Sequence, residues 1–202
     1  MISNSYFALL KEAADVVGVK LFEVEWKSLG DLLDYEQPTK YIVSSTEYRD
    51  SYKIPVLTAG QSFILGYTNE TEGIYKANKK YPVIIFDDFT TGNHWVDFEF
   101  KVKSSAMKIL KPKNSINFRY CYHYIQTINI DTTEHKRLWI SKVSHIKIPI
   151  PPLEVQEYIV SILDKFDELI NDISKGLPKE IELRQKQYEY YREKLLNFPR
   201  EK

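Results

Sequence analysis

Three carboxylates and a lysine in the middle of the chain have the types and spacing of a metal-dependent active site. Asp87 and Asp88 directly follow a short apolar run, and Glu99 and Lys101 stand two positions apart on the next predicted strand. Carboxylate oxygens are the ligands that magnesium prefers, and a lysine can help to position an attacking water. Many magnesium-dependent nucleases use this arrangement, and such an enzyme would use Asp87, Glu99 and Lys101 here. A solvated sheet face is the simpler interpretation, because an alternating charged strand often produces Glu-x-Lys by chance.

A second group of side chains could bind phosphate. Residues 101–147 carry ten Lys or Arg against Asp131 and Glu134, a net charge of +8, whereas the whole chain has 28 basic and 28 acidic residues. The bulk charge therefore indicates no nucleic-acid partner, but a basic block between near-neutral helices is expected where phosphate contacts come from one region. The alternative is that basic residues simply gather on one strand-rich surface.

The composition excludes several classes of site. The 202 residues are 43% hydrophobic, which allows one core, or one core with an appendage. Cys121 is the only cysteine, and the four histidines show no metal-ligand pairing, so no disulfide framework or cysteine-rich zinc site is expected. The sequence shows no signal peptide and no apolar run of membrane-spanning length, which predicts a reducing, cytoplasmic location.

The elements that must position these side chains fall into three stretches. Helical spacing over 3–17 ends at Gly18 and predicts an N-terminal helix, and a short amphipathic piece follows over 27–33. From 35 to 149 the residues and turn signals favour strands, namely a buried one over 83–86, a half-solvated one over 95–102, and others over 106–110 and 139–150. Residues 118–128 favour a helix. The expected turns lie at 58–60, 69–70, 77–78 and 91–93.

The chain changes character at residues 145–163. Pro149, Pro151 and Pro152 require an extended backbone, and a helix with a seven-residue apolar repeat follows at once. A second helix is predicted over 179–197, after Gly176 and Pro178. The two helices have more apolar surface than the middle domain needs for cover, so we expect a partner helix from another chain. The residues expected to face that partner are Ile181, Tyr188, Tyr191 and Leu195.

The predicted fold class is α+β. A strand-rich domain with a twisted mixed or antiparallel sheet is followed by a long helical, coiled-coil-forming C-terminal arm. The expected boundaries are an N-terminal helix over 1–22, a middle domain over 23–150 and a helical region over 151–202.

Three blocks of sequence point to one family. The first is Val-Glu-Trp-Lys-Ser-Leu-Gly-Asp at 24–31, and the second comprises the runs at 54–60 and 82–91. The third, at 148–167, combines prolines, a following glutamine, heptads and a Leu-Asp-Lys run. With these blocks in order, the sequence resembles the specificity subunit of type I restriction–modification enzymes over about 20–198. The resemblance implies that 23–150 is a DNA target-recognition domain and that 151–202 is the family's conserved helical dimerisation or spacer region.

The resemblance also implies how the work is divided among partners. A specificity subunit is not itself an enzyme and directs methyltransferase (modification) and restriction subunits to a bipartite site on double-stranded DNA. No Gly-rich phosphate loop is present. We therefore expect no cofactor in this chain, and S-adenosylmethionine, ATP and magnesium on the partner subunits.

The chain departs from the family pattern in one respect. Family members usually carry two recognition domains and two conserved helices, whereas this sequence shows one of each. It therefore resembles a half subunit, or a fragment, and we expect a homodimer that presents two recognition domains to DNA.

The side chains expected at DNA follow from how proteins read it, since base edges are read by polar side chains and phosphates are held by Lys and Arg. Turn formation is the simpler explanation for each polar residue taken alone. The expected readers of base edges are Thr58, Gln61, Ser62, Thr90, Thr91, Asn93 and His94. The expected phosphate contacts are Lys101, Lys103, Lys108, Lys111, Arg119, Lys136 and Arg137, with Ser104 and Ser105 as further donors. The fifteen tyrosines are expected to be core or rim residues of the sheet.

Overall fold

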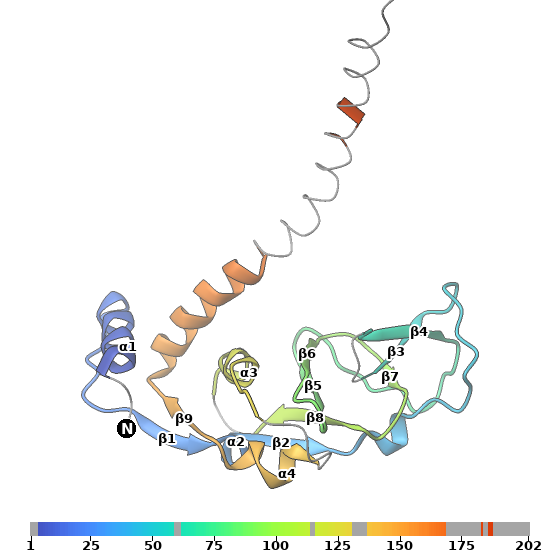
Figure 1. Cartoon of the computed structure of the whole chain (residues 1–202), viewed down its shortest axis with the longest axis horizontal. Coiled ribbons are helices and arrows are strands. Elements are labelled where there is room, and N and C mark those ends of the chain that lie inside the picture. The colour runs from blue at the N-terminus through green and yellow to red at the C-terminus, as the bar shows by residue number, and fades with distance from the viewer. Residues whose placement is uncertain are drawn as a thin grey trace, which may run out of the picture. The chain divides into compact units, whose positions relative to one another are not determined.

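The computed structural model describes residues 4–58, 62–113, 116–130, 137–168, 183 and 186–187. The chain divides into two units, Met1–Val160 and Ser161–Lys202. The described residues of the first unit form helices α1 to α4 and strands β1 to β9, which are labelled in Figure 1. Among the described residues, no helix combines the length and the apolar character that crossing a membrane requires.

The N-terminal helix is confirmed. Helix α1 spans Asn4–Val16, and Gly18 follows with a φ of 73°, a backbone conformation that glycine adopts readily. Leu10 and Ala14 on this helix are buried against Leu21 and Val155, so the two ends of the first unit share a small apolar cluster.

The larger sheet has four strands in the order β2-β8-β5-β6, all antiparallel to their neighbours. They are β2 (Leu33–Glu36), β8 (Met107–Pro112), β5 (Val83–Asp87) and β6 (Asn93–Val96). Every residue of β5 is buried, which confirms the continuous apolar run as a strand covered on both faces. The turn between β5 and β6 falls where Thr91-Gly92-Asn93 predicted it.

A smaller sheet has the order β4-β3-β7, with β3 (Ile54–Leu57), β4 (Ile64–Thr68) and β7 (Lys101–Val102). Strand β7 runs parallel to β3. The prediction of one half-solvated strand over 95–102 is therefore wrong, because β6 ends at Val96 and the chain crosses to the second sheet. The alternation of polar and apolar residues continues through the crossing, but both residues of β7 are buried.

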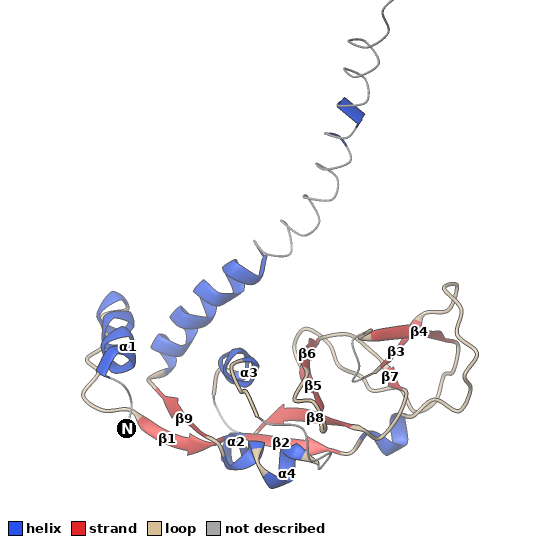
Figure 2. Ribbon diagram, in the orientation of Figure 1, coloured by secondary structure: helices blue, strands red, loops and turns tan. Residues whose placement is uncertain are grey.

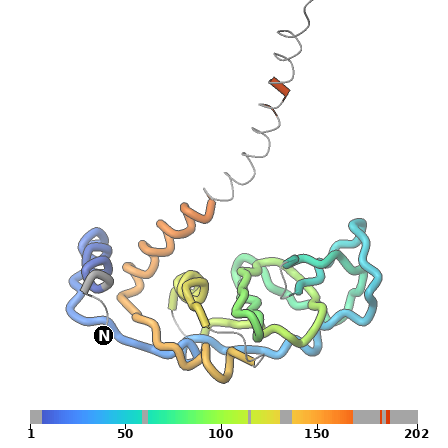
Figure 3. The backbone as a smooth tube through the Cα atoms, in the orientation of Figure 1, coloured from blue at the N-terminus to red at the C-terminus, as the bar shows by residue number. Residues whose placement is uncertain are grey.

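A third pairing joins segments that are far apart in the sequence. Strand β1 (Glu25–Ser28) pairs antiparallel with β9 (Lys147–Ile150), and Figure 3 shows the two chain segments side by side. Ser28 then caps the short helix α2 (Leu29–Leu32) by accepting from the N–H of Asp31. The family-like block at 24–31 is thus a strand followed by a capped turn of helix.

Three helical pieces lie between β8 and β9, as the ribbon in Figure 2 shows. Helix α3 (Phe118–Gln126) confirms the helix favoured over 118–128. The strand predicted over 139–150 is confirmed only at 147–150, since α4 (Leu138–Ser141) and the 3-10 turn η2 (Val143–His145) precede it. Leu138, Trp139 and Val143 are buried while Ser141 is exposed, a pattern that fits helical spacing and breaks the alternation of a strand. A further 3-10 turn, η1 (Pro38–Tyr41), follows β2.

The proline junction leads directly into a helix over 153–168. Gln156 at its start is buried, donates to the carbonyl of Pro151 (2.8 Å) and accepts from the N–H of Asn117 (3.1 Å). The junction is therefore fixed by a side chain of the helix that follows it. The predicted arm beyond residue 168 and the helix over 179–197 lie outside the residues for which a continuous structure is described. The fold class, α+β with antiparallel and mixed sheets, is confirmed.

Candidate nucleic-acid interface

The turn between β5 and β6 is held by the side chain of Asp87. Its Oδ1 accepts from the N–H groups of Phe89 (2.8 Å) and Thr90 (3.1 Å). Its backbone N–H donates to the carbonyl of Gly92 (2.7 Å), and its carbonyl accepts from Thr91 (3.1 Å). The carboxylate of Asp87 therefore builds the turn, and the exposed edge of the turn is left to Thr90 and Gly92.

Thr91 has an unusual backbone conformation in this turn. Its φ is 64°, in a region that β-branched residues rarely adopt, and among the described residues it alone combines a positive φ with a side chain. The side chain of Asn93 donates to the carbonyl of Thr91 (3.2 Å), while its Oδ1 is buried without a hydrogen-bond partner in the described part of the chain. Strained residues and unpaired polar atoms of this kind gather at functional sites.

The two described ends of the β3–β4 connection are joined to each other, and one of them contacts β6. The N–H of Thr58 donates to the carbonyl of Phe63 (2.9 Å), and Ser62 between them is exposed. The Phe63 ring stacks on His94 with centroids 4.0 Å apart. The stack therefore joins the two predicted reading blocks through Phe63, the neighbour of Ser62, and His94, the neighbour of Asn93. Gln61 lies outside the described residues.

Lys101 is inside the domain. Its side chain is 4% exposed, and its Nζ lies 2.7 Å from Glu70 Oε2 and 2.7 Å from the carbonyl of Glu72. Glu70 also accepts from the backbone N–H groups of Ser44 and Ser45. Burial opposes ionisation of Glu70, but Lys101 and these donors outweigh it and lower the pKa of the carboxyl. Lys101 thus ties two loops to β7 and presents no charge at the surface.

Lys108 is also buried. Its Nζ lies 3.2 Å from Oδ2 of Asp88, and both side chains are 0% exposed. The carbonyl of Asp88 accepts from the N–H of Leu138 (2.8 Å), and its Oδ1 accepts from the N–H of Trp139 (2.8 Å). Arg137, which is half exposed, approaches the same carboxylate at 3.9 Å. This ion pair therefore fastens the start of α4 to the large sheet.

The other predicted phosphate contacts differ in exposure. Lys103 and Ser104 are exposed and Ser105 is half-buried, with Lys103 Nζ over the Tyr48 ring. The guanidinium of Arg119 lies over the rings of Trp95 (4.9 Å) and Tyr122 (4.7 Å). Lys136 lies outside the described residues.

Lys111 belongs to a cluster around Glu36. Its Nζ lies 2.9 Å from Glu36, which also binds Lys40 (2.8 Å) and the hydroxyl of Tyr41 (2.9 Å). Burial opposes ionisation of Glu36, but these three donors outweigh it and lower the pKa of the carboxyl to about 2. Among the described residues, the acids that pair with lysines of the basic block include Glu36, Glu70, Asp88 and Asp34, all outside 101–147, so a charge count along that segment could not reveal them.

The nuclease interpretation has no support in these contacts. Asp87 builds a turn, Glu99 pairs with Lys76 (2.9 Å), and Lys101 pairs with Glu70. Asp88 is buried against Lys108. The residues proposed as a metal site are therefore used separately to hold the fold.

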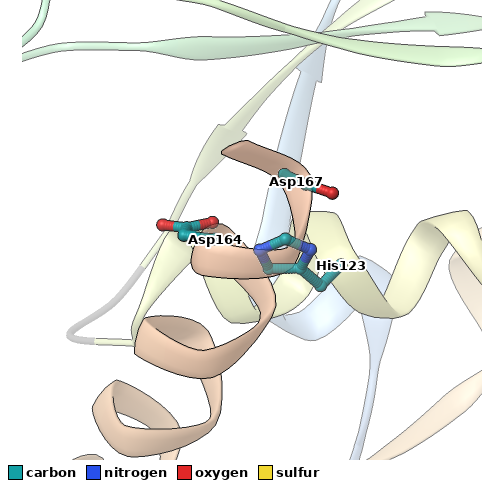
Figure 4. Close-up of side chains that lie close together, drawn as sticks. All are labelled: His123, Asp164 and Asp167. Atoms are coloured by element: carbon teal, nitrogen blue, oxygen red, sulfur yellow. The ribbon is translucent and has the colours of Figure 1, made fainter. Parts of the chain in front are cut away.

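Three further side chains of metal-binding type are shown in Figure 4. His123 is buried on α3, within the first unit. Asp164 and Asp167 stand three positions apart on the helix over 153–168, within the second unit, so they share one helical face. Ile181, Tyr188, Tyr191 and Leu195, predicted to contact a partner helix, lie outside the described residues.

The sequence is similar to that of known proteins of one family. Residues 23–183 match the family model described as the type I restriction modification DNA specificity domain. The chain is 53% identical over 187 residues to a type I restriction enzyme specificity subunit of Escherichia coli, which covers 87% of this chain and 45% of that one. It is 37% identical over 141 residues to a putative specificity subunit of Haemophilus influenzae, covering 65% and 37%.

Solved structures show the same fold at low sequence identity. The HsdS subunit from Thermoanaerobacter tengcongensis matches with a TM-score of 0.51 at 17% identity, over 85% of this chain and 46% of that one. The type I restriction-modification S subunit from M. genitalium matches with a TM-score of 0.59 at 15% identity, over 92% and 48%. The chain thus spans about half the length of these relatives, or less.

Proposed function

The chain belongs to the type I restriction–modification DNA specificity family, and from that premise we propose that it reads one half of a bipartite target in double-stranded DNA. Proteins of this family are not enzymes by themselves, so this chain carries no catalytic step of its own. The observation that carries the proposal is the family match across 23–183. The adjoining β3–β4 and β5–β6 turns offer a place where base edges can be read.

The reading residues that we propose are Ser62, Thr90, Asn93 and His94, with Thr58, Gln61 and Thr91 in the same two turns. Hydroxyl, amide and imidazole groups can each donate to or accept from base edges in the major groove. Lys103, Arg137 and Lys136, with Ser104 and Ser105, are proposed to hold backbone phosphates. Arg119 is retained as a phosphate contact, while the buried Lys101 and Lys108 and the paired Lys111 are left out.

We propose that modification and restriction subunits act on the DNA that this chain selects. S-adenosylmethionine, ATP and magnesium would be bound by those partners. The experiment is to purify the chain together with its modification subunit and to sequence the sites that the complex methylates. A single defined motif supports the proposal, and methylation without sequence preference contradicts it.

A second recognition domain is needed to read the other half of a bipartite site, and we propose that a second copy of this chain supplies it. The predicted helical region over 151–202 is the proposed contact between the copies. Light scattering of the 202-residue chain at micromolar concentration should give twice 23.8 kDa. A mass of 23.8 kDa would contradict the homodimer but leave DNA reading by one domain untouched.

The proposed domain limits follow from the same assignment. They are an N-terminal helix over 1–22, a recognition domain over 23–150 and a helical region over 151–202. The buried contact of Leu10 and Ala14 with Val155 supports treating the first helix as a partner of the junction rather than of the sheets.

A further inference from the structure

Two aromatic rings join the polar turns of the candidate interface. The Phe63 and His94 rings are stacked, with centroids 4.0 Å apart and planes 21° apart. Phe63 directly precedes β4 at the edge of the three-stranded sheet, and His94 lies in β6 at the edge of the four-stranded sheet. The stack is therefore a contact between two separate sheets, formed next to both turns.

Each ring is fixed by its own hairpin. The carbonyl of Phe63 accepts from the N–H of Thr58, which closes the β3–β4 turn, and Phe63 packs against the buried cluster that contains Leu57 and Val96. His94 pairs with Ile85 of the fully buried strand β5. Because Phe63 packs on the buried cluster and His94 is paired with the buried strand β5, a change at either ring alters how Ser62 is placed relative to Asn93.

The chemistry of the stack favours a neutral imidazole. His94 is half-buried, and burial lowers the pKa of its imidazole. A neutral imidazole packs on a phenyl ring without the desolvation cost of a charge, so the contact depends on ring against ring.

The second turn is itself held firmly. Two N–H groups donate to the Asp87 carboxylate, and Thr91 is kept at a positive φ. A stiff turn passes a displacement on to its neighbour instead of absorbing it. The stack therefore links one stiff turn to a second turn that Thr58 and Phe63 close.

We propose that the Phe63–His94 stack makes the two turns a single reading surface for base edges of double-stranded DNA, with Phe63 as its positioning residue. Phe63 acts by setting the placement of Ser62 relative to Asn93, not by contacting a base. The inference rests on the proposed function and adds that specificity at the two turns is coupled. Base positions read by one turn then depend on a residue of the other.

The test uses the full chain bound to its modification subunit and a pool of duplexes of random sequence. Sequencing the retained duplexes gives the base preference at each position of the site. Ser62→Ala and Asn93→Ala first identify which positions depend on each turn. Phe63→Leu, which keeps apolar volume but removes the ring, should weaken the preference about three- to tenfold at both sets of positions.

Two conservative variants separate positioning from plain structural support. Phe63→Tyr keeps a ring at the contact and should restore the preference at the Asn93 positions. His94→Phe keeps the stack and removes the imidazole nitrogens, so it should retain the preference at the Ser62 positions. If Phe63→Leu acted only by loosening the fold, a ring at position 63 would not restore the preference at the base positions that depend on Asn93 in the other turn.

The outcomes distinguish the coupling from the function beneath it. A wild-type complex that selects no sequence contradicts the proposed function, and the coupling with it. If folded Phe63→Leu keeps the base preference of the wild type at the Asn93 positions, the coupling is contradicted but the proposed function is not. If Phe63→Leu does not fold, His94→Leu makes the same comparison from the other hairpin, read at the Ser62 positions, where unchanged preference is again the contradicting result.

Discussion

The lysines of strands β7 and β8 and the polar residues of the hairpin turns have opposite environments in this domain. The side chains of Lys101 and Lys108 are 4% and 0% exposed and pair with Glu70 and Asp88, whereas Ser62 and Thr90 are exposed. These two lysines hold loops and sheets together, while Ser62 and Thr90 leave their hydroxyl groups available to a ligand. We therefore expect the exposed turn residues to be a better guide to the DNA-facing surface than the positive charges of β7 and β8.

The largest effect is expected from breaking the buried ion pair. Lys108→Ala leaves Asp88 buried without its counter-charge and should lower the free energy of unfolding by about 3–5 kcal/mol. Lys103→Ala, an exposed lysine in the same segment, should change it by less than about 0.5 kcal/mol. Urea unfolding of both variants measures the difference. Equal stabilities would mean that Lys108 is not held by Asp88.

The next effect concerns the turns and is seen in DNA binding. Asn93→Ala should reduce discrimination at its base positions by about 1 kcal/mol, the low end for a side-chain contact with a base edge, because its Oδ1 is buried and only the amide N–H can reach a base. Binding to an unrelated duplex should change much less. Fluorescence anisotropy with matched and single-substituted duplexes measures both, and an equal loss on every duplex would assign Asn93 to phosphate contact instead.

A uniform loss is expected where phosphates are held. Replacing Lys136 and Arg137 together with Ala should weaken binding to all sequences alike. Each lost phosphate contact should reduce the slope of log affinity against log salt by about 0.9. Titrations at several salt concentrations provide the slope. An unchanged slope would place this segment away from DNA.

A smaller effect is expected at the strained residue of the β5–β6 turn. Asn adopts a positive φ more easily than Thr, so Thr91→Asn should raise the free energy of unfolding by about 0.5–1 kcal/mol. The same substitution should alter base preference if the turn contacts DNA. Gain of stability with an unchanged preference would show that the turn faces elsewhere.

The smallest effect is expected from pH, at the Glu36 cluster. The pKa of Glu36 is about 2 in the fold against an ordinary value of 4.5. The folded state therefore favours the ionised form, and the stability that this form contributes is present above about pH 4.5 and is lost as the pH falls towards 2. The difference in Tm between wild type and Glu36→Gln should narrow over that window. A difference that stays constant would mean that Glu36 is not paired with Lys40 and Lys111.

Much of this fold could be predicted because the residues that determine these elements are neighbours in the sequence. The end of α1 at Gly18, the buried run of β5 and the Thr91-Gly92-Asn93 turn each follow from a few neighbouring residues. The strand over 95–102 was wrong because alternation alone does not show that Val96 and Val102 belong to different sheets. The strand at 139–145 was wrong because Leu138 and Trp139 are both buried while Ser141 is exposed, which does not fit the alternation of a strand.

The candidate site was predicted less completely, since it depends on contacts between distant segments. The polar turns could be identified from Thr58, Ser62, Thr90 and Asn93. The sequence did not indicate that Phe63 joins them. An aromatic residue directly after a polar turn was the available signal for Phe63. The partners of Lys101 and Lys108 lie 31 and 20 positions earlier in the chain, so no count along the basic block could show that these charges are neutralised.

Selection of duplexes by the chain bound to its modification subunit tests the central claim most directly. The comparison is between a turn variant, Thr90→Ala with Asn93→Ala, and a lysine variant, Lys103→Ala, at an exposed lysine just after β7. We predict that the turn variant changes which bases are selected at defined positions, while the lysine variant keeps the selected sequence and loses affinity evenly. A changed sequence in the lysine variant with an unchanged one in the turn variant would contradict the account.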